Sequence, residues 1–310
     1  MRARRIGALE VSEVGVGCNN FGARLDEAGT KAVVDAAIEA GITFFDTADI
    51  YGGTQSEVLL GRALGSRRRD VVVATKFGMP VDDTHSGAAP TYVRQALDDS
   101  LRRLGTDYVD LYQLHAPDAA TPIADTLGAL DELVRRGKVR QIGCSNFTAA
   151  QLEEAAAAVA PGAAGFASVQ NQYSLLYREP EAGVLPWCAA HGTSFLPYYP
   201  LASGLLSGKY VAGTAPEPGT RLAAYPPDRT SAWLTERNFD ALARLRVYAE
   251  AQGHSVLELA FAWLLAHPPV ASVIAGAMSP AQVRANAAAA SWVLEESELA
   301  AVDELVAPGA

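Results

Sequence analysis

Four side chains with complementary acid–base chemistry lie in the first part of the chain: Asp46, Tyr51, Lys76 and His115. A tyrosine titrates near pH ~10 in water, so it is a weak acid at neutral pH unless a neighbour lowers its pKa. A lysine ammonium would lower that pKa, and an aspartate would keep the lysine charged and oriented. A histidine beside them can hydrogen-bond a carbonyl oxygen. Together the four residues predict a site that polarises a C=O group and donates a proton to it.

Short apolar runs are the elements that must position these residues, because polar residues end or follow most of them. The runs are Val14–Gly17, Ile42–Phe45, Val71–Thr75, Val109–Leu114, Val139–Gly143, Ala167–Val169, Ser194–Tyr198 and Ala271–Ala275. The polar or small residues at their ends are Cys18, Asn19, Asp46, Lys76, His115, Ser145, Asn146, Gln170, Tyr199 and Gly276. In a closed parallel barrel all of these ends lie on one face, which is where such barrels build their sites.

Helical patterns alternate with the apolar runs. They cover Asp26–Ala40, Gln55–Leu64, Thr91–Leu104, Ile123–Arg136, Ala149–Val159, Glu181–His191, Leu234–Gln252, Val256–Ala266 and Pro280–Ala290. This alternation predicts an α/β protein with a parallel sheet, and eight units favour one (β/α)8 TIM barrel over residues 1–310. An open dinucleotide-binding sheet is the alternative, because Gly15-Val16-Gly17 begins like G-x-G-x-x-G. Asn20 stands where the third glycine belongs, which disfavours it.

Two stretches depart from the alternation. Residues 1–13 predict a hairpin, Ala3–Ile6 and Leu9–Glu13 around Gly7-Ala8, that caps the bottom of the barrel. Residues 203–233 form a long insert rich in glycine and proline after the seventh strand. An insert of this length without regular structure is usually functional in a compact domain.

The composition narrows the classes of partner. The net charge is −10, which disfavours nucleic-acid binding, and no apolar segment predicts a membrane span or a signal peptide. The three cysteines are widely spaced, which fits reduced thiols and predicts neither a disulfide framework nor a metal site. We therefore expect a cytoplasmic protein. The sequence leaves the oligomeric state open.

Three long motifs resemble those of one known family. Residues 46–52 (DTADIYG), 104–115 (LGTDYVDLYQLH) and 138–147 (KVRQIGCSNF) are similar to signatures of the aldo-keto reductases, and the resemblance runs in order from about residue 4 to 306. It extends to the branch that includes potassium-channel β-subunit-like reductases. It implies an NADP(H)-dependent reductase of small-molecule aldehydes and ketones. Tyr51 would be its general acid, Asp46 and Lys76 the pair that tunes Tyr51, and His115 the residue that orients the carbonyl. The reverse reaction would oxidise an alcohol.

The resemblance also implies a set of cofactor-binding residues. Ser145, Asn146 and Gln170 would hold the nicotinamide carboxamide, and Tyr199 would stack on the nicotinamide ring. The backbone that follows, with Lys209 and Arg221, would bind the pyrophosphate. The full set is Cys18, Asn19, Asp46, Ser145, Asn146, Gln170, Tyr199, Pro200, Leu201, Ala202, Ser203, Gly204, Lys209, Arg221, Gly276, Met278, Gln282 and Asn286.

The family reads adenine and the 2′-phosphate of NADP at the start of the last barrel helix, often with Arg or Lys. This chain has Met278, Gln282 and Ala285 at three of those positions. Losing a bidentate phosphate contact weakens selectivity for NADP. Ser279, Arg221 or Arg284 could compensate, so NADP(H) is favoured and NAD(H) stays possible.

Substrate-facing residues are the least determined. Candidates, any of which could instead be ordinary packing, are Phe21, Phe77, Met79, the loop 80–90, Leu176, Tyr177 and Trp233. Two other functions stay open from the residues alone. One is a cofactor-binding regulatory subunit with little turnover. The other is a hydrolase with paired carboxylates, although Asp46 is the only acidic residue among the strand ends above.

Overall fold

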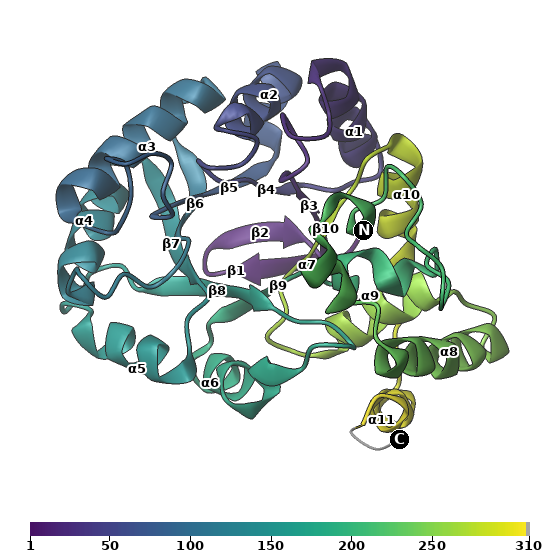
Figure 1. Ribbon diagram of the computed structural model, residues 1–310. Helices are drawn as coiled ribbons and strands as arrows, with labels where there is room; N and C mark the ends of the chain where they lie inside the picture. The colour runs from purple at the N-terminus through teal and green to yellow at the C-terminus, as the bar shows by residue number, and fades with distance from the viewer. Residues whose placement is uncertain (308–310) are drawn as a thin grey trace.

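The computed structural model describes residues 1–307 and shows a ring of parallel strands surrounded by helices (Figure 1). The barrel strands are β3 (Val14–Gly17), β4 (Phe44–Asp46), β5 (Val72–Phe77), β6 (Val109–Leu114), β7 (Val139–Ser145), β8 (Phe166–Gln172), β9 (Ser194–Tyr198) and β10 (Val273–Gly276). The helices are α1 (Glu27–Glu39), α2 (Gln55–Leu64), α3 (Pro90–Leu104), α4 (Ile123–Arg135), α5 (Ala149–Ala158), α6 (Val184–His191), α7 (Pro227–Ser231), α8 (Glu236–Ala251), α9 (Val256–Ala266), α10 (Pro280–Ala289) and α11 (Glu296–Leu305).

The strand order confirms the predicted TIM barrel. The strands β3 to β9 lie side by side in chain order and pair in parallel, and β10 pairs with β3. The ring closes between β9 and the residues just before β10: the Phe195 N–H donates to the Pro269 carbonyl at 2.7 Å, and the Ala271 N–H donates to the Phe195 carbonyl at 3.0 Å. The carboxyl ends of the strands therefore share one face.

A hairpin closes the other end of the barrel, as the sequence predicts. It consists of β1 (Ala3–Ile6) and β2 (Leu9–Ser12), which lie across the centre of the ring in Figure 1. Ile6, Leu9 and Val11 are buried and form one cluster with inward-facing side chains of the barrel, among them Phe44 and Leu111. Burying an aliphatic side chain of this size stabilises a fold by roughly 1.5–3 kcal/mol, so the hairpin is an integral part of the core.

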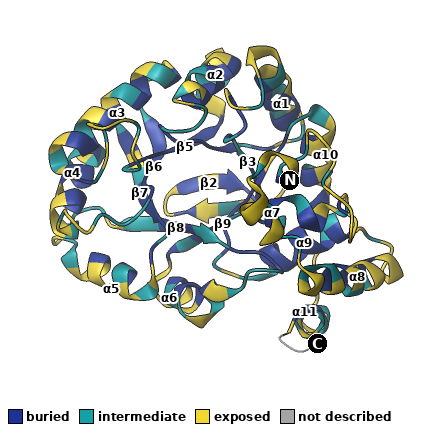
Figure 2. Cartoon of the chain, viewed as in Figure 1, coloured by how far each residue is buried: buried dark blue, intermediate teal, exposed yellow. Residues whose placement is uncertain are grey.

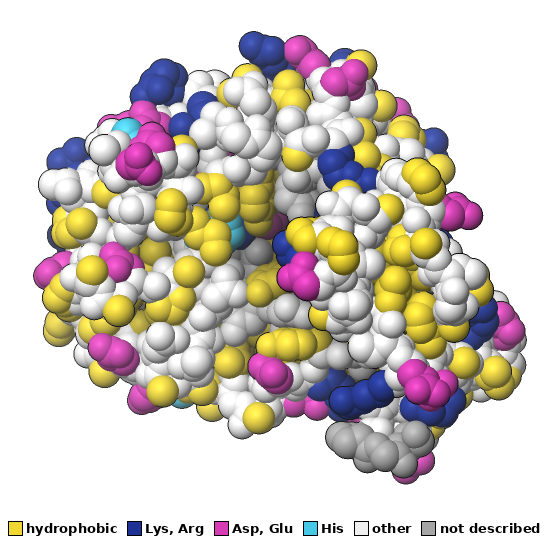
Figure 3. All heavy atoms as spheres, in the orientation of Figure 1, with side chains coloured by type: hydrophobic (Ala, Val, Ile, Leu, Met, Phe, Trp, Pro, Cys, Tyr) yellow, Lys and Arg dark blue, Asp and Glu magenta, His cyan; other side chains and the backbone are white. Residues whose placement is uncertain are grey.

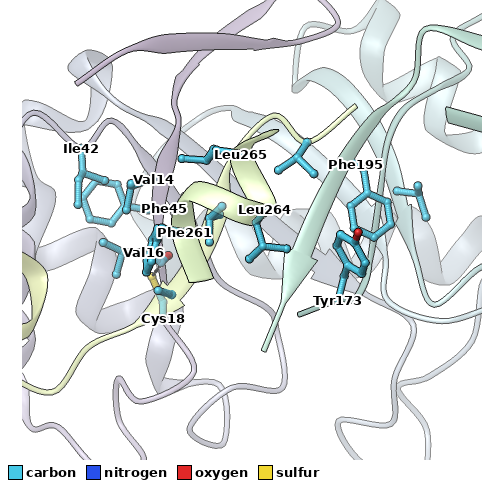
Figure 4. Close-up of a cluster of buried hydrophobic side chains, with 14 of the residues drawn as sticks. Val14, Val16, Cys18, Ile42, Phe45, Tyr173, Phe195, Phe261, Leu264 and Leu265 are labelled. Atoms are coloured by element: carbon cyan, nitrogen blue, oxygen red, sulfur yellow. Dashed lines mark hydrogen bonds between the residues drawn. The ribbon is translucent and has the colours of Figure 1, made fainter. Parts of the chain in front are cut away.

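A second, larger core lies between the outer face of the strands and the helices. Figure 4 shows part of it, with Val14 and Phe45 from the strands near Phe261 of α9. Most residues of the barrel strands are buried in Figure 2, whereas the helices expose their outer sides. Gly15 packs on the inward side of the strands instead, because a Cβ there would lie 2.8 Å from Cδ1 of the inward-facing Phe44. Strand packing thus explains this glycine. The closure of the ring excludes the open dinucleotide-binding sheet.

The elements differ from the expectation in a few places. The last strand begins at Val273 instead of Ala271, because Ala271 pairs with Phe195 to close the ring. The insert after β9 is not structureless: it contains α7 and the short 3-10 helices Ala202–Ser207 and Leu222–Ala224. The terminal helix α11 was not predicted. Within residues 1–307, no helix combines the length and apolar character needed to cross a membrane.

Candidate active site

The four acid–base residues meet at the carboxyl end of the barrel. Asp46 ends β4, Lys76 lies in β5, and His115 directly follows β6. The Lys76 ammonium donates to Oδ2 of Asp46 at 2.6 Å, to the Thr47 carbonyl at 2.9 Å and to the Tyr51 hydroxyl at 3.4 Å. The rings of Tyr51 and His115 pack edge to face with centroids 5.7 Å apart. The structure thus brings together residues from two strands and from the two loops that follow β4 and β6.

Electrostatics at Tyr51 differ from the simple expectation. Burial raises the pKa of the Tyr51 hydroxyl by more than the Lys76 ammonium lowers it. Burial also lowers the pKa of Lys76, but the Asp46 carboxylate and Tyr51 outweigh that effect, so its pKa is raised overall. At neutral pH the protein therefore holds a protonated phenol against a charged ammonium. Tyr51 can give a proton, and Lys76 can stabilise the phenolate that results.

The His115 ring is neutral across the physiological pH range. Burial and the nearby Lys76 ammonium lower its pKa to about 3. Its Nδ1 atom is buried and has no hydrogen-bond partner among residues 1–307. A neutral imidazole can donate one N–H to a carbonyl oxygen without bringing a second positive charge to the site.

Amide and hydroxyl groups on β7 and β8 continue the polar network. The Ser145 hydroxyl donates to the Gln170 carbonyl at 2.7 Å, and the Asn146 side-chain amide donates to the His115 carbonyl at 2.9 Å. The amide group of Gln170 donates to Oδ1 of Asp46 at 2.9 Å. Gln170 therefore connects the residues predicted to hold the nicotinamide with the acid–base residues.

Tyr198 stands closer to this network than the predicted Tyr199. Its hydroxyl donates to Oδ1 of Asn146 at 2.8 Å, and its side chain lines the central cavity. The Tyr199 ring instead contacts the insert: its hydroxyl accepts from Arg229 at 3.2 Å, and the Arg221 guanidinium lies 5.5 Å from the ring centroid. Tyr198 is thus the aromatic residue beside Asn146, and Tyr199 joins the barrel to the insert.

A cavity of about 730 Å³ opens over the acid–base residues, a volume typical of small-molecule sites. Figure 3 shows the hollow near the middle of this face of the barrel. Tyr51, His115 and all but two of the residues predicted to hold the cofactor line it. The exceptions are Cys18 and Ala202, which are completely buried in the core behind the wall. Lys76 is also completely buried and acts on the cavity only through its neighbours.

Four cationic side chains line the cavity on the side of the insert. Lys209 and Arg221 were predicted, whereas Arg24 and Arg229 were not. Their hydrogen-bond partners are neutral: Arg221 donates to Oδ1 of Asn19 at 3.1 Å, and Arg24 donates to the Gly219 carbonyl. Their positive charge is therefore available to an anion in a protein of net charge −10.

The backbone beside these cations passes through the left-handed region. Tyr199, Ala202, Ser203 and Gly204 all have positive φ angles, from 48° to 96°. Two N–H groups of this stretch are used within the chain, because Ala202 donates to the Tyr199 carbonyl at 2.9 Å and Gly204 donates to the Leu201 carbonyl at 2.8 Å. Gly204 also leaves room for the Lys209 ammonium, since a Cβ there would lie 3.0 Å from Nζ. The donors of this wall that fit a diphosphate are therefore its cationic side chains.

Another part of the cavity wall is formed by β10 and the start of α10, and it begins beside Arg221: a Cβ at Gly276 would lie 3.5 Å from Nη2 of Arg221. Gly276, Met278, Gln282, Ala285 and Asn286 line it, all without positive charge. The Gln282 side chain is used locally, because its Oε1 accepts the Met278 N–H at 2.7 Å. Two residues named as compensation do not line the cavity. Ser279 caps α10 by accepting the Gln282 N–H, and Arg284 points to Glu39 at 3.9 Å.

Most of the proposed substrate-facing residues are not on the cavity wall. Phe21 and Phe77 are completely buried, and Phe77 stacks on Tyr112 with centroids 4.6 Å apart. Leu176, Tyr177 and Trp233 also lie away from the wall, whereas Met79 lines the cavity as expected. Ile50 and Gln172, which the sequence did not single out, line the cavity as well.

Asp49 is a buried acid that the predicted chemistry does not use. Its side chain is 1% exposed, and neither carboxyl oxygen has a hydrogen-bond partner of good geometry within residues 1–307. Burial and the nearby Glu57 carboxylate raise its pKa to about 7, while Arg103, the Ile50 N–H and Lys76 only partly offset them.

The Asp49→Asn variant should therefore be more stable than the wild type at alkaline pH. Asp49 titrates near pH ~4 in the unfolded chain, so between about pH 4 and 7 the native state binds the additional proton and the unfolding free energy falls as pH rises. Asparagine does not titrate, so the variant lacks this decrease in unfolding free energy. We expect a gain of up to about 4 kcal/mol at pH 8 and little difference near pH 4, measured by urea unfolding. Equal effects at both pH values would show that Asp49 does not titrate in this range.

Comparisons with known proteins agree with this geometry. Residues 13–307 match the family model described as "Aldo/keto reductase family". Aldo-keto reductase str7 of Strobilurus tenacellus is 36% identical, covering 97% of this chain and 91% of the relative. Probable aldo-keto reductase 1 of Glycine max is 33% identical, covering 97% and 87%.

A third relative is named as a channel subunit instead of a reductase. The probable voltage-gated potassium channel subunit beta of Oryza sativa subsp. japonica is 33% identical, covering 92% of this chain and 90% of the relative. Each of the three matches covers at least 92% of this chain, and all three support the same family assignment. The chain belongs to the aldo/keto reductase family of oxidoreductases.

Proposed function

We propose that the protein is an NAD(P)H-dependent reductase of small aldehydes or ketones, with Tyr51 as general acid. One observation carries the proposal. The half-buried phenol of Tyr51 lies 3.4 Å from an ammonium that Asp46 holds in place, and it lines a cavity of about 730 Å³. A reduced nicotinamide, when bound, supplies the hydride that adds to the carbonyl carbon.

The side chains of this chain would complete the reaction at the carbonyl oxygen. His115, being neutral, donates a hydrogen bond that orients and polarises the C=O group. Tyr51 transfers its proton to the oxygen as negative charge develops there. The phenolate that remains is stabilised by Lys76, whose charge Asp46 maintains. For alcohol oxidation the same phenolate would accept the proton, so that direction would be favoured at higher pH.

The orientation of Gln170 supports a carboxamide ligand. Its NH₂ group donates inward to Oδ1 of Asp46 at 2.9 Å and to the side-chain oxygen Oε1 of Gln113 at 3.5 Å. Its own carbonyl oxygen therefore stays available to accept a hydrogen bond from a ligand. A ligand N–H, such as that of the nicotinamide carboxamide, is the complementary group.

NADPH remains the favoured cofactor and NADH a possible one. Introducing Met278→Arg should tighten NADPH relative to NADH, because a guanidinium there would pair with a 2′-phosphate beside the uncharged residues at the start of α10. Dissociation constants of both cofactors, measured by fluorescence titration, check this, with Arg284→Met as a control that changes charge away from the cavity. An unchanged ratio of the two constants would contradict this placement of the 2′-phosphate.

The proposed reaction is tested by turnover of the purified protein with an activated aromatic aldehyde. NADPH and NADH are supplied in parallel reactions, and oxidation of each cofactor is followed by its absorbance. Turnover supports the reductase proposal. A protein that binds the cofactor but turns over none of a panel of aldehydes and ketones would instead favour a regulatory subunit, the role that the name of the rice relative suggests.

A further inference from the structure

Gln113 is completely buried inside the barrel, one layer below the cavity, and neither its sequence context nor any comparison gives it a role. We propose that Gln113 is a positioning residue, whose amide fixes Asp46 and thereby holds Lys76 against Tyr51. The inference rests on the proposed function of Tyr51 and Lys76, and it adds a residue that does not touch the substrate or the cofactor.

The hydrogen bonds of Asp46 show what Gln113 does. Oδ2 accepts the Lys76 ammonium at 2.6 Å. Oδ1 accepts two amide N–H groups, from Gln170 at 2.9 Å and from Gln113 at 3.2 Å. The Gln170 amide also donates to Oε1 of Gln113 at 3.5 Å, so Asp46, Gln113 and Gln170 form a closed ring of contacts. This ring fixes the plane of the carboxylate and hence the direction in which Oδ2 faces.

The barrel register places Gln113 level with Lys76. Lys76 of β5 is the pairing partner of Gln113 of β6, and Gln113 is the partner of Gly143 of β7. Gly143 leaves space for the amide: a Cβ at that position would lie 2.6 Å from Oγ of Ser168 and 3.2 Å from Cγ of Gln113. A glycine on one strand therefore permits a long polar side chain on the next.

An amide suits this position better than a charged or an apolar group. A buried carboxylate requires hydrogen-bond donors, and a second cation beside Oδ1 would compete with Lys76 for its charge. An apolar side chain would leave Oδ1 with Gln170 alone, and Gln170 also lines the cavity. Gln113 is not on the cavity wall, so it can hold Asp46 in the same way whether or not the cavity is occupied.

The test compares two apolar replacements, Gln113→Met and Gln113→Leu, with Ser168→Ala as the control. Ser168 lies in the same layer, and its buried hydroxyl has no hydrogen-bond partner within residues 1–307. For the Gln113 variants we expect kcat to fall ten- to a hundredfold, the loss typical of a hydrogen bond to a charged group. The dissociation constant of the cofactor should change less than twofold, and Ser168→Ala should change neither quantity.

The pH profile of alcohol oxidation separates positioning from packing. Asp46 raises the pKa of Tyr51, and without the Gln113 donor its charge is compensated less. The pH at which oxidation reaches half of its maximum should therefore move upward in the Gln113 variants only. The inference is overturned if the Gln113 variants keep the wild-type kcat or if their pH profile is unshifted. It is also overturned if both variants fail to fold while Ser168→Ala folds. Tyr51→Phe keeps the two proposals apart, because full activity in that variant would contradict the proposed function itself.

Discussion

Tyr51→Phe should lower turnover of a carbonyl substrate by about a thousandfold, within the range usual for loss of a general acid. The substitution removes the only atom of Tyr51 that contacts Lys76 as a hydrogen-bond acceptor and leaves the ring, which packs on His115, in place. Folding and cofactor binding should therefore be unchanged. Steady-state kinetics with a saturating cofactor and a fluorescence titration of that cofactor measure the two effects separately.

Tyr112→Phe provides the matched control. Tyr112 is a completely buried tyrosine on β6 whose hydroxyl donates to the Val93 carbonyl at 3.2 Å, away from the cavity. Its loss should leave kcat within about twofold at a cost in stability of roughly 1 kcal/mol. If Tyr51→Phe loses cofactor binding together with turnover, Tyr51 has a structural role and the acid must be sought elsewhere.

Lys76→Met should impair both turnover and stability. The phenolate of Tyr51 loses the charge that stabilises it, so we expect kcat to fall by at least a hundredfold. Asp46 loses its partner at 2.6 Å in a site where both side chains are almost completely buried. Removing one member of a buried ion pair typically costs about 3–5 kcal/mol, because the other charge is left uncompensated.

The double variant Asp46→Asn/Lys76→Met distinguishes the two effects. It removes both charges, so urea unfolding should show most of the lost stability restored, while turnover stays low. A double variant as unstable as Lys76→Met alone would mean that the stability loss comes from packing around the lysine stem. Recovery of turnover would show that the charge on Lys76 is not required.

The barrel could be predicted because its strands contain short apolar runs, and polar residues end or follow most of them. Val109–Leu114 and Ser194–Tyr198 have the predicted bounds. The sequence does not reveal which distant residues pair with each other. The last strand begins later than its apolar pattern because the Ala271 N–H donates to the Phe195 carbonyl on the other side of the closure.

Helix α11 could have been predicted from the sequence, since Leu299, Val302 and Leu305 recur at a spacing of three, which is typical of one helix face.

The acid–base residues could be predicted because three of them lie at strand ends and the fourth lies in the loop after one.

The position of Tyr198 could have been predicted from the alternation of side chains along its strand. Leu196 points into the barrel interior, and side chains alternate along a strand, so Tyr198 faces the same side. Tyr199 has left the strand and has a φ angle of 51°. The partner of Gln113 was not predictable, because its contact with Asp46 crosses 67 residues and depends on the register of two strands.

The pairing of β3 with β10 has a consequence for synthesis of the protein. Val14 and Val273 are partners, so the two edges of the sheet meet only after nearly the whole chain has left the ribosome. Until then β3 keeps one row of backbone donors and acceptors unpaired, the kind of edge that pairs with other chains. The acid–base residues, which end at His115, are made early, whereas the wall formed by β10 and α10 is made late. A nascent chain therefore exposes this half-built site longest, and that interval is when a chaperone would have most to protect.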